Sequence, residues 1–187
     1  MKKSTKKFWK NTISMIAIAV MFVSTMAGFM AIFVGPSSSF LLKSPYSLFM
    51  YFDAYKVDYN IREIALNMSK GCKGNQDCVV IQIYKNLSET LIYSNTPYDS
   101  YMNKYEVLRE KSADCKSMSG LYVNLLINMG IVAYVDSNIR YKHAVAIAEP
   151  RGADYYYMID LTVPEIQRFD KGQDHWKLRF ENHQGLI

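Results

Sequence analysis

Three side chains in the second half of the chain could together carry out nucleophilic chemistry: Cys115, His143 and Asp160. A thiol becomes an effective nucleophile when a neighbouring imidazole takes its proton, and a carboxylate on the other ring nitrogen fixes the tautomer of that imidazole. These residue types therefore indicate nucleophilic chemistry through an activated thiol. Each also has an ordinary structural interpretation, because a lone cysteine is commonly a small buried hydrophobic residue.

Cys115 stands at the start of a helix predicted over 116–129. Asp114 is a suitable N-cap residue and Gly130 a suitable stop. One face of this helix is apolar and contains Leu121, Leu125, Leu126 and Met129. The start of a helix favours negative charge, and its first N–H groups lack helical acceptors. A thiolate is therefore favoured at Cys115, and the Cys115 backbone N–H is a candidate oxyanion donor.

His143 and Asp160 fall on neighbouring predicted strands. Strands are predicted over 131–135, 143–149 and 154–162, from alternating, aromatic or β-branched residues. A Pro-Arg-Gly turn separates the last two, so they are expected to pair in antiparallel fashion. His143 begins one strand and Asp160 lies near the end of the next, and this pairing would bring their side chains together.

Two further helices are predicted upstream, from apolar residues at helical spacing. The first covers 61–68 and ends near Gly71, the second begins near Asp77, and 93–100 is expected to be a loop. Helices followed by an antiparallel meander indicate the α+β class. With no internal repeat or linker, 57–187 is expected to form a single domain.

The other two cysteines, Cys72 and Cys78, bracket the short polar loop CKGNQDC between these two helices. Their separation in space must be small, so a disulfide is geometrically feasible, and two free thiols are the alternative. A C-x5-C spacing without a nearby histidine is not typical of a zinc site. We therefore expect neither a metal nor a cofactor.

The amino-terminal region predicts a membrane anchor. Residues 13–34 are 22 consecutive uncharged and mostly apolar residues, which is long enough to cross a bilayer, and the transmembrane helix is placed over 13–35. The preceding tail, 1–12, is basic and is expected to stay in the cytoplasm, so the domain would face outward. The alternative is a cleaved signal peptide and a secreted domain, although secretory apolar regions are usually shorter.

The net charge of +5 belongs to this tail. Five lysines and no acidic residue occur in the first 35 residues, and the rest of the chain has 17 basic and 17 acidic residues. Nucleic acid is thus not an expected partner, because its binding needs basic residues clustered on the folded domain. Residues 36–56 form a linker or juxtamembrane segment, whose apolar part either lies at the membrane interface or packs as the first element of the domain.

The motifs around the three candidate residues resemble the transglutaminase-like superfamily. The string ADCKSMSGLYVNLLINMGI, then KHAVAIAE, then YYYMIDLT is similar to that family's Asp-Cys helix start, histidine strand and aromatic strand ending in Asp-x-Thr. The resemblance extends over about 58–162 and is nearest to small prokaryotic transglutaminase-like cysteine proteases. Two departures are Ala113, where the family usually has glycine, and Ala144-Val145, where an aromatic residue often follows the histidine.

The resemblance implies a papain-like α+β fold in which the cysteine helix packs on an antiparallel sheet. It implies Cys115 as nucleophile, His143 as general base and acid, and Asp160 as the residue that orients His143. The expected function is cleavage or transfer of acyl groups at peptide or amide bonds of a peptide or protein substrate, with a catalytically inactive binding or scaffold module as the alternative. His175 and His183 lie in a polar carboxyl-terminal stretch and are expected to be solvated, without a role.

Overall fold

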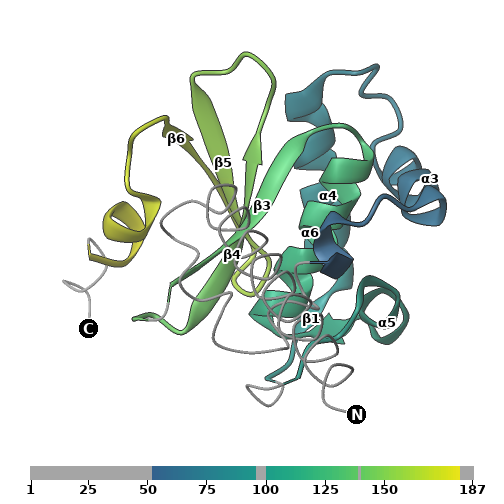
Figure 1. Ribbon diagram of the computed structural model, residues 1–187, viewed down its shortest axis with the longest axis horizontal. Coiled ribbons are helices and arrows are strands. Elements are labelled where there is room, and N and C mark those ends of the chain that lie inside the picture. Colours follow the sequence, from purple (N-terminus) through teal and green to yellow (C-terminus); the bar gives the residue numbers. More distant parts are fainter. Residues whose placement is uncertain (1–51, 96–99, 139, 182–187) are drawn as a thin grey trace, which may run out of the picture. The chain divides into compact units, whose positions relative to one another are not determined.

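The computed structural model describes residues 52–95, 100–138 and 140–181, all within the unit Phe40–Ile187 (Figure 1). The basic tail 1–12, the apolar segment 13–35 and most of the segment 36–56 lie outside the described residues. Among the residues that are described, no helix is long and apolar enough to cross a membrane.

Four α-helices form one side of the domain: α3 (Tyr59–Met68), α4 (Gln76–Thr90), α5 (Lys104–Glu110) and α6 (Cys115–Asn128). Local side chains begin them: Asp58 accepts from the Asn60 N–H and Asn75 from the Cys78 N–H. Asn103 and Glu106 form a complete capping box at the start of α5. Helix α6 lies between the other helices and the sheet, and most of its residues are buried (Figure 1).

The main sheet is antiparallel, with the strand order β3-β4-β5-β6. The strands are β3 (Val132–Asn138), β4 (His143–Glu149), β5 (Tyr155–Asp160) and β6 (Glu165–Asp170). A second, two-stranded sheet pairs β1 (Ile92–Tyr93) in parallel with β2 (Ser112–Ala113), just before α6. The chain therefore has the mixed helix and sheet architecture that was predicted, with β6, α5 and the β1–β2 pair as additions. Tyr93, expected in a loop, lies in β1 because its backbone pairs with Ala113.

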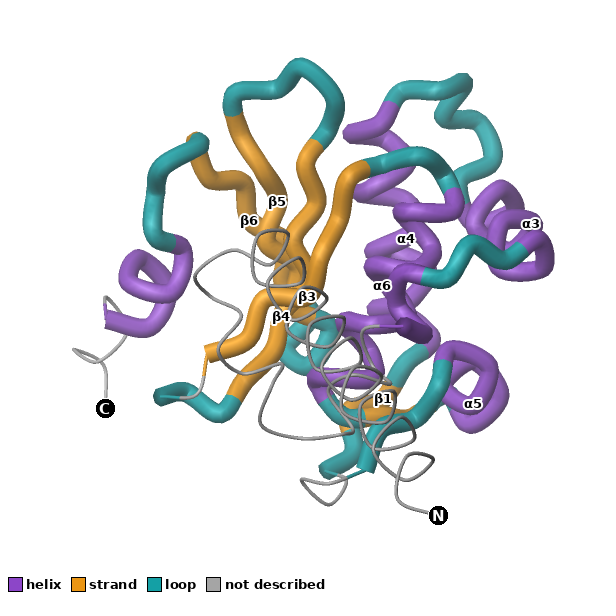
Figure 2. Tube along the Cα trace, in the orientation of Figure 1, coloured by secondary structure: helices purple, strands orange, loops and turns teal. Residues whose placement is uncertain are grey.

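The main sheet is covered on both faces, and Figure 2 shows the helices α3 to α6 on one side of it. On that face β4 presents the small residues Ala146 and Ala148, which allow α6 to pack closely. The other face carries a separate cluster of buried residues, Val145, Ile147, Tyr156, Met158, Phe169 and Trp176. Trp176 comes from the segment 171–181 that follows β6 and contains the π-helical turn η2 (Lys177–Glu181). We call these residues the carboxyl-terminal segment.

Residues just before the expected start of the domain also pack into it. Asn124 of α6 donates from its Nδ2 to three backbone carbonyls, those of Asp53 at 2.9 Å, Ala54 at 2.8 Å and Lys56 at 2.9 Å. The buried ammonium group of Lys104 lies 3.1 Å from Asp53 Oδ1. Residues 53–56, which the sequence assigned to the linker segment, are therefore fastened to α5 and α6.

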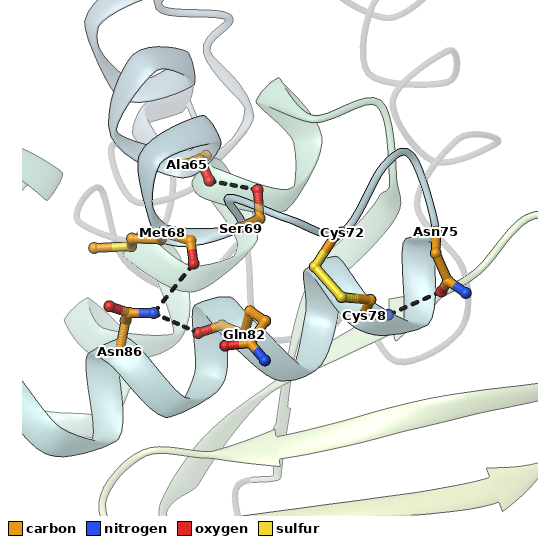
Figure 3. The surroundings of a disulfide bond; sticks show 8 residues. All are labelled: Ala65, Met68, Ser69, Cys72, Asn75, Cys78, Gln82 and Asn86. Carbon is orange, nitrogen blue, oxygen red and sulfur yellow. Dashed lines mark hydrogen bonds between the residues drawn. A yellow bond between two sulfur atoms is a disulfide. The ribbon is translucent and has the colours of Figure 1, made fainter.

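Cys72 and Cys78 form a disulfide, which confirms the predicted pairing (Figure 3). Their Cα atoms are 5.4 Å apart, across the loop that joins α3 to α4. Asn86 ties the same two helices together, because its Nδ2 donates to Met68 O at 3.2 Å and Gln82 O at 2.9 Å. Helix α3 ends at Met68 and its C-cap residue is Ser69 rather than Gly71, which adopts a positive φ of 100° in the loop that follows.

Candidate active site

Cys115 is the first residue of α6 and the one free cysteine among the described residues. Asp114 caps the helix as predicted, since its Oδ1 accepts from the Ser117 N–H at 2.9 Å. The β1–β2 pair fixes the chain immediately upstream, where Ser94 N donates to Ala113 O at 3.0 Å. As the first N–H of the helix, that of Cys115 has no helical acceptor. The half-buried thiol and this N–H thus share one position at the helix start.

The sheet brings the predicted histidine and aspartate together. His143 is the first residue of β4 and Asp160 the last residue of β5, so antiparallel pairing places both at the same end of the sheet. His143 Nε2 and Asp160 Oδ2 are 2.6 Å apart. The Cys115 side chain also interacts with His143 closely enough to raise the pKa of its imidazole. The structure therefore joins all three residues in one chain of contacts, with His143 in the middle.

Asp160 is almost completely buried, yet both of its oxygens have partners. Oδ1 accepts from the Thr162 N–H at 2.9 Å and from the Thr162 hydroxyl at 2.7 Å, while Oδ2 faces His143 and Arg179. Burial by itself raises the pKa of a carboxyl group. Here the hydrogen bonds and charge of His143, together with Thr162, outweigh burial and lower the pKa of Asp160 to about 2. Asp160 is thus ionised throughout the physiological pH range.

The pKa of His143 is shifted in the opposite direction, upward. Burial lowers the pKa of His143, but its hydrogen bonds with Asp160 and Cys115 and their negative charges outweigh this effect and raise it to about 9. An imidazole with such a pKa holds a second proton at neutral pH. Lys142, directly before His143, adopts a positive φ of 50°, which is uncommon for a residue with a side chain. The turn at Lys142 thus directly precedes β4, which begins at His143.

Three residues near the site were not expected from the sequence: Arg179, Glu165 and Trp176. Arg179 Nη1 lies 2.8 Å from Asp160 Oδ2, and its Nη2 lies 2.8 Å from Glu165 Oε2. The Trp176 ring meets the His143 ring edge-on, with centroids 6.5 Å apart. Both Arg179 and Trp176 come from the carboxyl-terminal segment, whose polar sequence has no apolar periodicity to mark it as packed.

The expectation for His175 was wrong, because this residue is buried rather than solvated. Its Nε2 lies 3.1 Å from Asp136 Oδ2, and its Nδ1 lies 3.0 Å from the Tyr156 hydroxyl. The Trp176 indole N–H donates to the same Asp136 oxygen at 3.0 Å. These contacts fasten the carboxyl-terminal segment to the outer face of the sheet. His183 lies outside the described residues.

Tyr93 is an exposed aromatic residue beside the candidate nucleophile. Partial burial and the negative charges of Cys115, Asp114 and Asp160 raise the pKa of its hydroxyl. Its side chain is nonetheless 48% exposed, so it borders the site on the solvent side. The described residues contain no cluster of histidine, cysteine and carboxylate side chains suited to a metal ion.

No known family model matches the chain, and no curated protein matches it either. The solved structures that are similar to this chain include the following two. One is a candidate protease from Parabacteroides distasonis, 15% identical, with a TM-score of 0.47, over 68% of this chain and 31% of that one. The other is a candidate cysteine protease from Cytophaga hutchinsonii, 14% identical, with a TM-score of 0.45, over 73% of this chain and 49% of that one. The present chain thus spans less than half the length of either protein.

Proposed function

We propose that the protein is a transglutaminase-like thiol enzyme of papain-like fold that cleaves or transfers acyl groups at peptide or amide bonds. The observation that carries this proposal is the position of His143, which lies 2.6 Å from Asp160 and interacts with the Cys115 side chain at the start of α6. A nucleophile, a base and a residue that orients the base are the parts needed for covalent acyl transfer.

In the proposed reaction, the proton of the Cys115 thiol rests on His143, in keeping with the raised pKa of His143, and the Cys115 sulfur attacks the carbonyl carbon of the substrate as a thiolate. The Cys115 backbone N–H then faces the oxyanion of the tetrahedral intermediate. His143 returns its proton to the leaving amine, the C–N bond breaks and an acyl thioester remains on Cys115. Water or a second amine, deprotonated by His143, attacks the thioester and releases the Cys115 thiolate beside the protonated His143. We expect hydrolysis to be the main outcome.

The electrostatics of the site fit this cycle. A pKa of about 9 at His143 stabilises the protonated imidazole that forms when the thiol gives up its proton. Asp160, with a pKa of about 2, stays ionised and can accept from His143 Nε2 throughout. The thiolate and imidazolium would thus form beside a fixed negative charge rather than in bulk water.

The departures from the family motif fall at packed positions. Ala113 is fully buried in β2, where its carbonyl accepts from Ser94, and Ala144 is buried in β4. Neither side chain supplies a reacting group. The departures therefore give no reason to prefer an inactive scaffold module, which becomes an outcome of the test below.

For the whole chain, we propose a single-pass protein anchored in the lipid bilayer by residues 13–35, with the domain 57–187 outside the cytoplasm. The supports are the uncharged 22-residue run and the five lysines before it. A detergent requirement for extraction from membranes would agree with the anchor. Release by alkaline carbonate would instead show a cleaved and secreted form.

The decisive experiment combines a thiol-directed activity probe with profiling on a peptide and amide library. The wild-type protein should be labelled at Cys115 and should turn over a subset of the library. Cys115→Ser and His143→Gln should reduce turnover about a thousandfold or more, while circular dichroism shows both variants to be folded. A folded Cys115→Ser protein with unchanged turnover would refute the enzyme. No turnover by any variant, together with specific retention of a peptide, would favour the scaffold module.

A further inference from the structure

The carboxyl-terminal segment places a buried arginine between two carboxylates at the end of the sheet. Asp160 and Glu165 are direct partners in the β5–β6 register, so their side chains share one face of the sheet. Arg179 lies between them: its Nη1 is 2.8 Å from Asp160 Oδ2 and its Nη2 is 2.8 Å from Glu165 Oε2. Only 5% of its side chain is exposed. Two carboxylates on neighbouring strands would repel one another, and the guanidinium removes that repulsion.

Arg179 approaches the same oxygen of Asp160 that faces His143. Oδ2 is 2.6 Å from His143 Nε2 and 2.8 Å from Arg179 Nη1. In the proposed reaction His143 alternates between charged and neutral forms. The positive charge that lowers the pKa of Asp160 is therefore lost whenever His143 is neutral. A guanidinium group, unlike an imidazole, does not give up its charge during such a cycle. The charge of Arg179 can therefore keep Asp160 ionised when His143 is neutral.

We propose that Arg179 is a positioning residue of the active site. It bridges Asp160 and Glu165, keeps Asp160 aimed at His143 and thereby keeps the neutral imidazole in the Nε2–H tautomer, with Nδ1 left to the thiol. This inference rests on the proposed function. It also makes the site dependent on a segment that comes after all three candidate residues in the sequence.

The way the segment is anchored supports this role. Three residues before Arg179, Trp176 donates to Asp136 of β3 and meets the His143 ring edge-on. His175 lies against the same Asp136 oxygen. The segment that carries Arg179 is thus held in two places, at the edge strand β3 through Asp136 and at the start of β4 through His143. These two contacts limit the movement of the guanidinium group. A lysine at this position has a single ammonium group and cannot reproduce the planar two-sided bridge.

The test compares Arg179→Met, Arg179→Lys and, as a matched control, Arg168→Met. Arg168 is an exposed arginine of β6 that lies over the Tyr155 ring, away from the Asp160 contacts. Two readouts are needed: steady-state kcat and KM, and the tautomer of His143 by ¹⁵N NMR at a pH above its titration. The NMR readout needs no turnover, so it tests the positioning role separately from the proposed activity.

We expect Arg179→Met to lower kcat by about tenfold or more with little change in KM, because the substrate contacts remain while the base is misaligned. The Nε2–H tautomer should no longer dominate. Arg179→Lys should fall between wild type and Arg179→Met in both readouts, and Arg168→Met should match wild type. Wild-type kcat and tautomer in folded Arg179→Met would overturn the proposal. If that variant does not fold, wild-type values of both readouts in Arg179→Lys would overturn it.

Discussion

Thr162 donates twice to one oxygen of Asp160, through its backbone N–H at 2.9 Å and its hydroxyl at 2.7 Å from Oδ1. A residue only two positions further along the chain thus fixes one oxygen of the carboxylate and leaves the other for His143. The Asp-x-Thr spacing in the sequence has a physical reason, because this short turn aims the acidic side chain.

Replacing Thr162 by valine should weaken this arrangement without changing side-chain volume greatly. The buried Oδ1 loses its hydroxyl donor and keeps only the backbone N–H, so we expect a loss of about 1 kcal/mol in the free energy of unfolding and a severalfold lower kcat. Denaturant unfolding and turnover measure the two effects. Thr162→Ser keeps the hydroxyl and should stay close to wild type, and equal losses in both variants would contradict the hydrogen-bond explanation.

The pKa of His143 should depend on the charge of Asp160. Burial alone lowers this pKa, and Asp160 contributes two of the interactions that raise it to about 9. In Asp160→Asn the negative charge is gone, so the midpoint of the His143 titration should move downward. An NMR titration of His143 reports the change directly. A midpoint that remained at the wild-type value would show that Asp160 does not control the protonation of His143.

His143 and Asp160 should also make the free energy of unfolding depend on pH. The pKa of His143 is raised from 6.5 to about 9, so its stabilising contribution is complete below pH 6.5 and is lost as the pH rises through 9. The pKa of Asp160 is lowered from 3.8 to about 2, so its contribution is complete above pH 3.8 and is lost as the pH falls through 2. The difference in unfolding free energy between wild type and His143→Gln should therefore shrink from pH 6.5 to 9. A constant difference would contradict this linkage.

Gly120 in the middle of α6 should tolerate alanine only if Tyr101 is shortened. A Cβ atom at Gly120 would lie 2.7 Å from the Tyr101 hydroxyl oxygen, while its contacts with the ring are an ordinary 3.5 Å. We expect Gly120→Ala to cost about 1 kcal/mol or more in the free energy of unfolding, despite the better helix propensity of alanine. The same change in a Tyr101→Phe background should be neutral or stabilising. A double-mutant cycle by denaturant unfolding measures the coupling, and strict additivity would rule out the clash.

The Cys72–Cys78 disulfide closes a short loop, with a sequence separation of 6. The loop-closure relation gives a stabilisation of about 2 kcal/mol for such a loop, so the Cys72→Ala, Cys78→Ala double variant should unfold at lower denaturant. Reduction of the wild-type protein should reproduce the shift, and the double variant should not respond to reductant. Two titratable thiols at these positions in the non-reduced, denatured wild type would exclude the bridge.

The elements that hold the candidate residues could be predicted because their signals are local. Asp114 caps α6, and HAVAIAE corresponds residue for residue to β4. His143 and Asp160 sit at strand ends, so their proximity follows from element boundaries and antiparallel pairing alone. By contrast, α5 has only seven residues, too few for a periodic apolar pattern, although Asn103 and Glu106 do mark its capping box.

The carboxyl-terminal part of the site could not be predicted in the same way. The sequence around His175, Trp176 and Arg179 is polar, and their contact partners are distant in sequence. Asp136, for example, is 40 positions from Trp176. Strand β6 is an edge strand with mixed polar residues, so its alternation is weak. Contacts of this kind become visible only when the sheet has set the register between β5 and β6.

The fastening of residues 53–56 by Asn124 has a mechanical consequence. The side-chain amide of Asn124, in α6, holds three backbone carbonyls of this segment. Tension applied to residues 53–56 would therefore be transmitted to α5 through Lys104 and to α6, the helix that begins at Cys115, through Asn124.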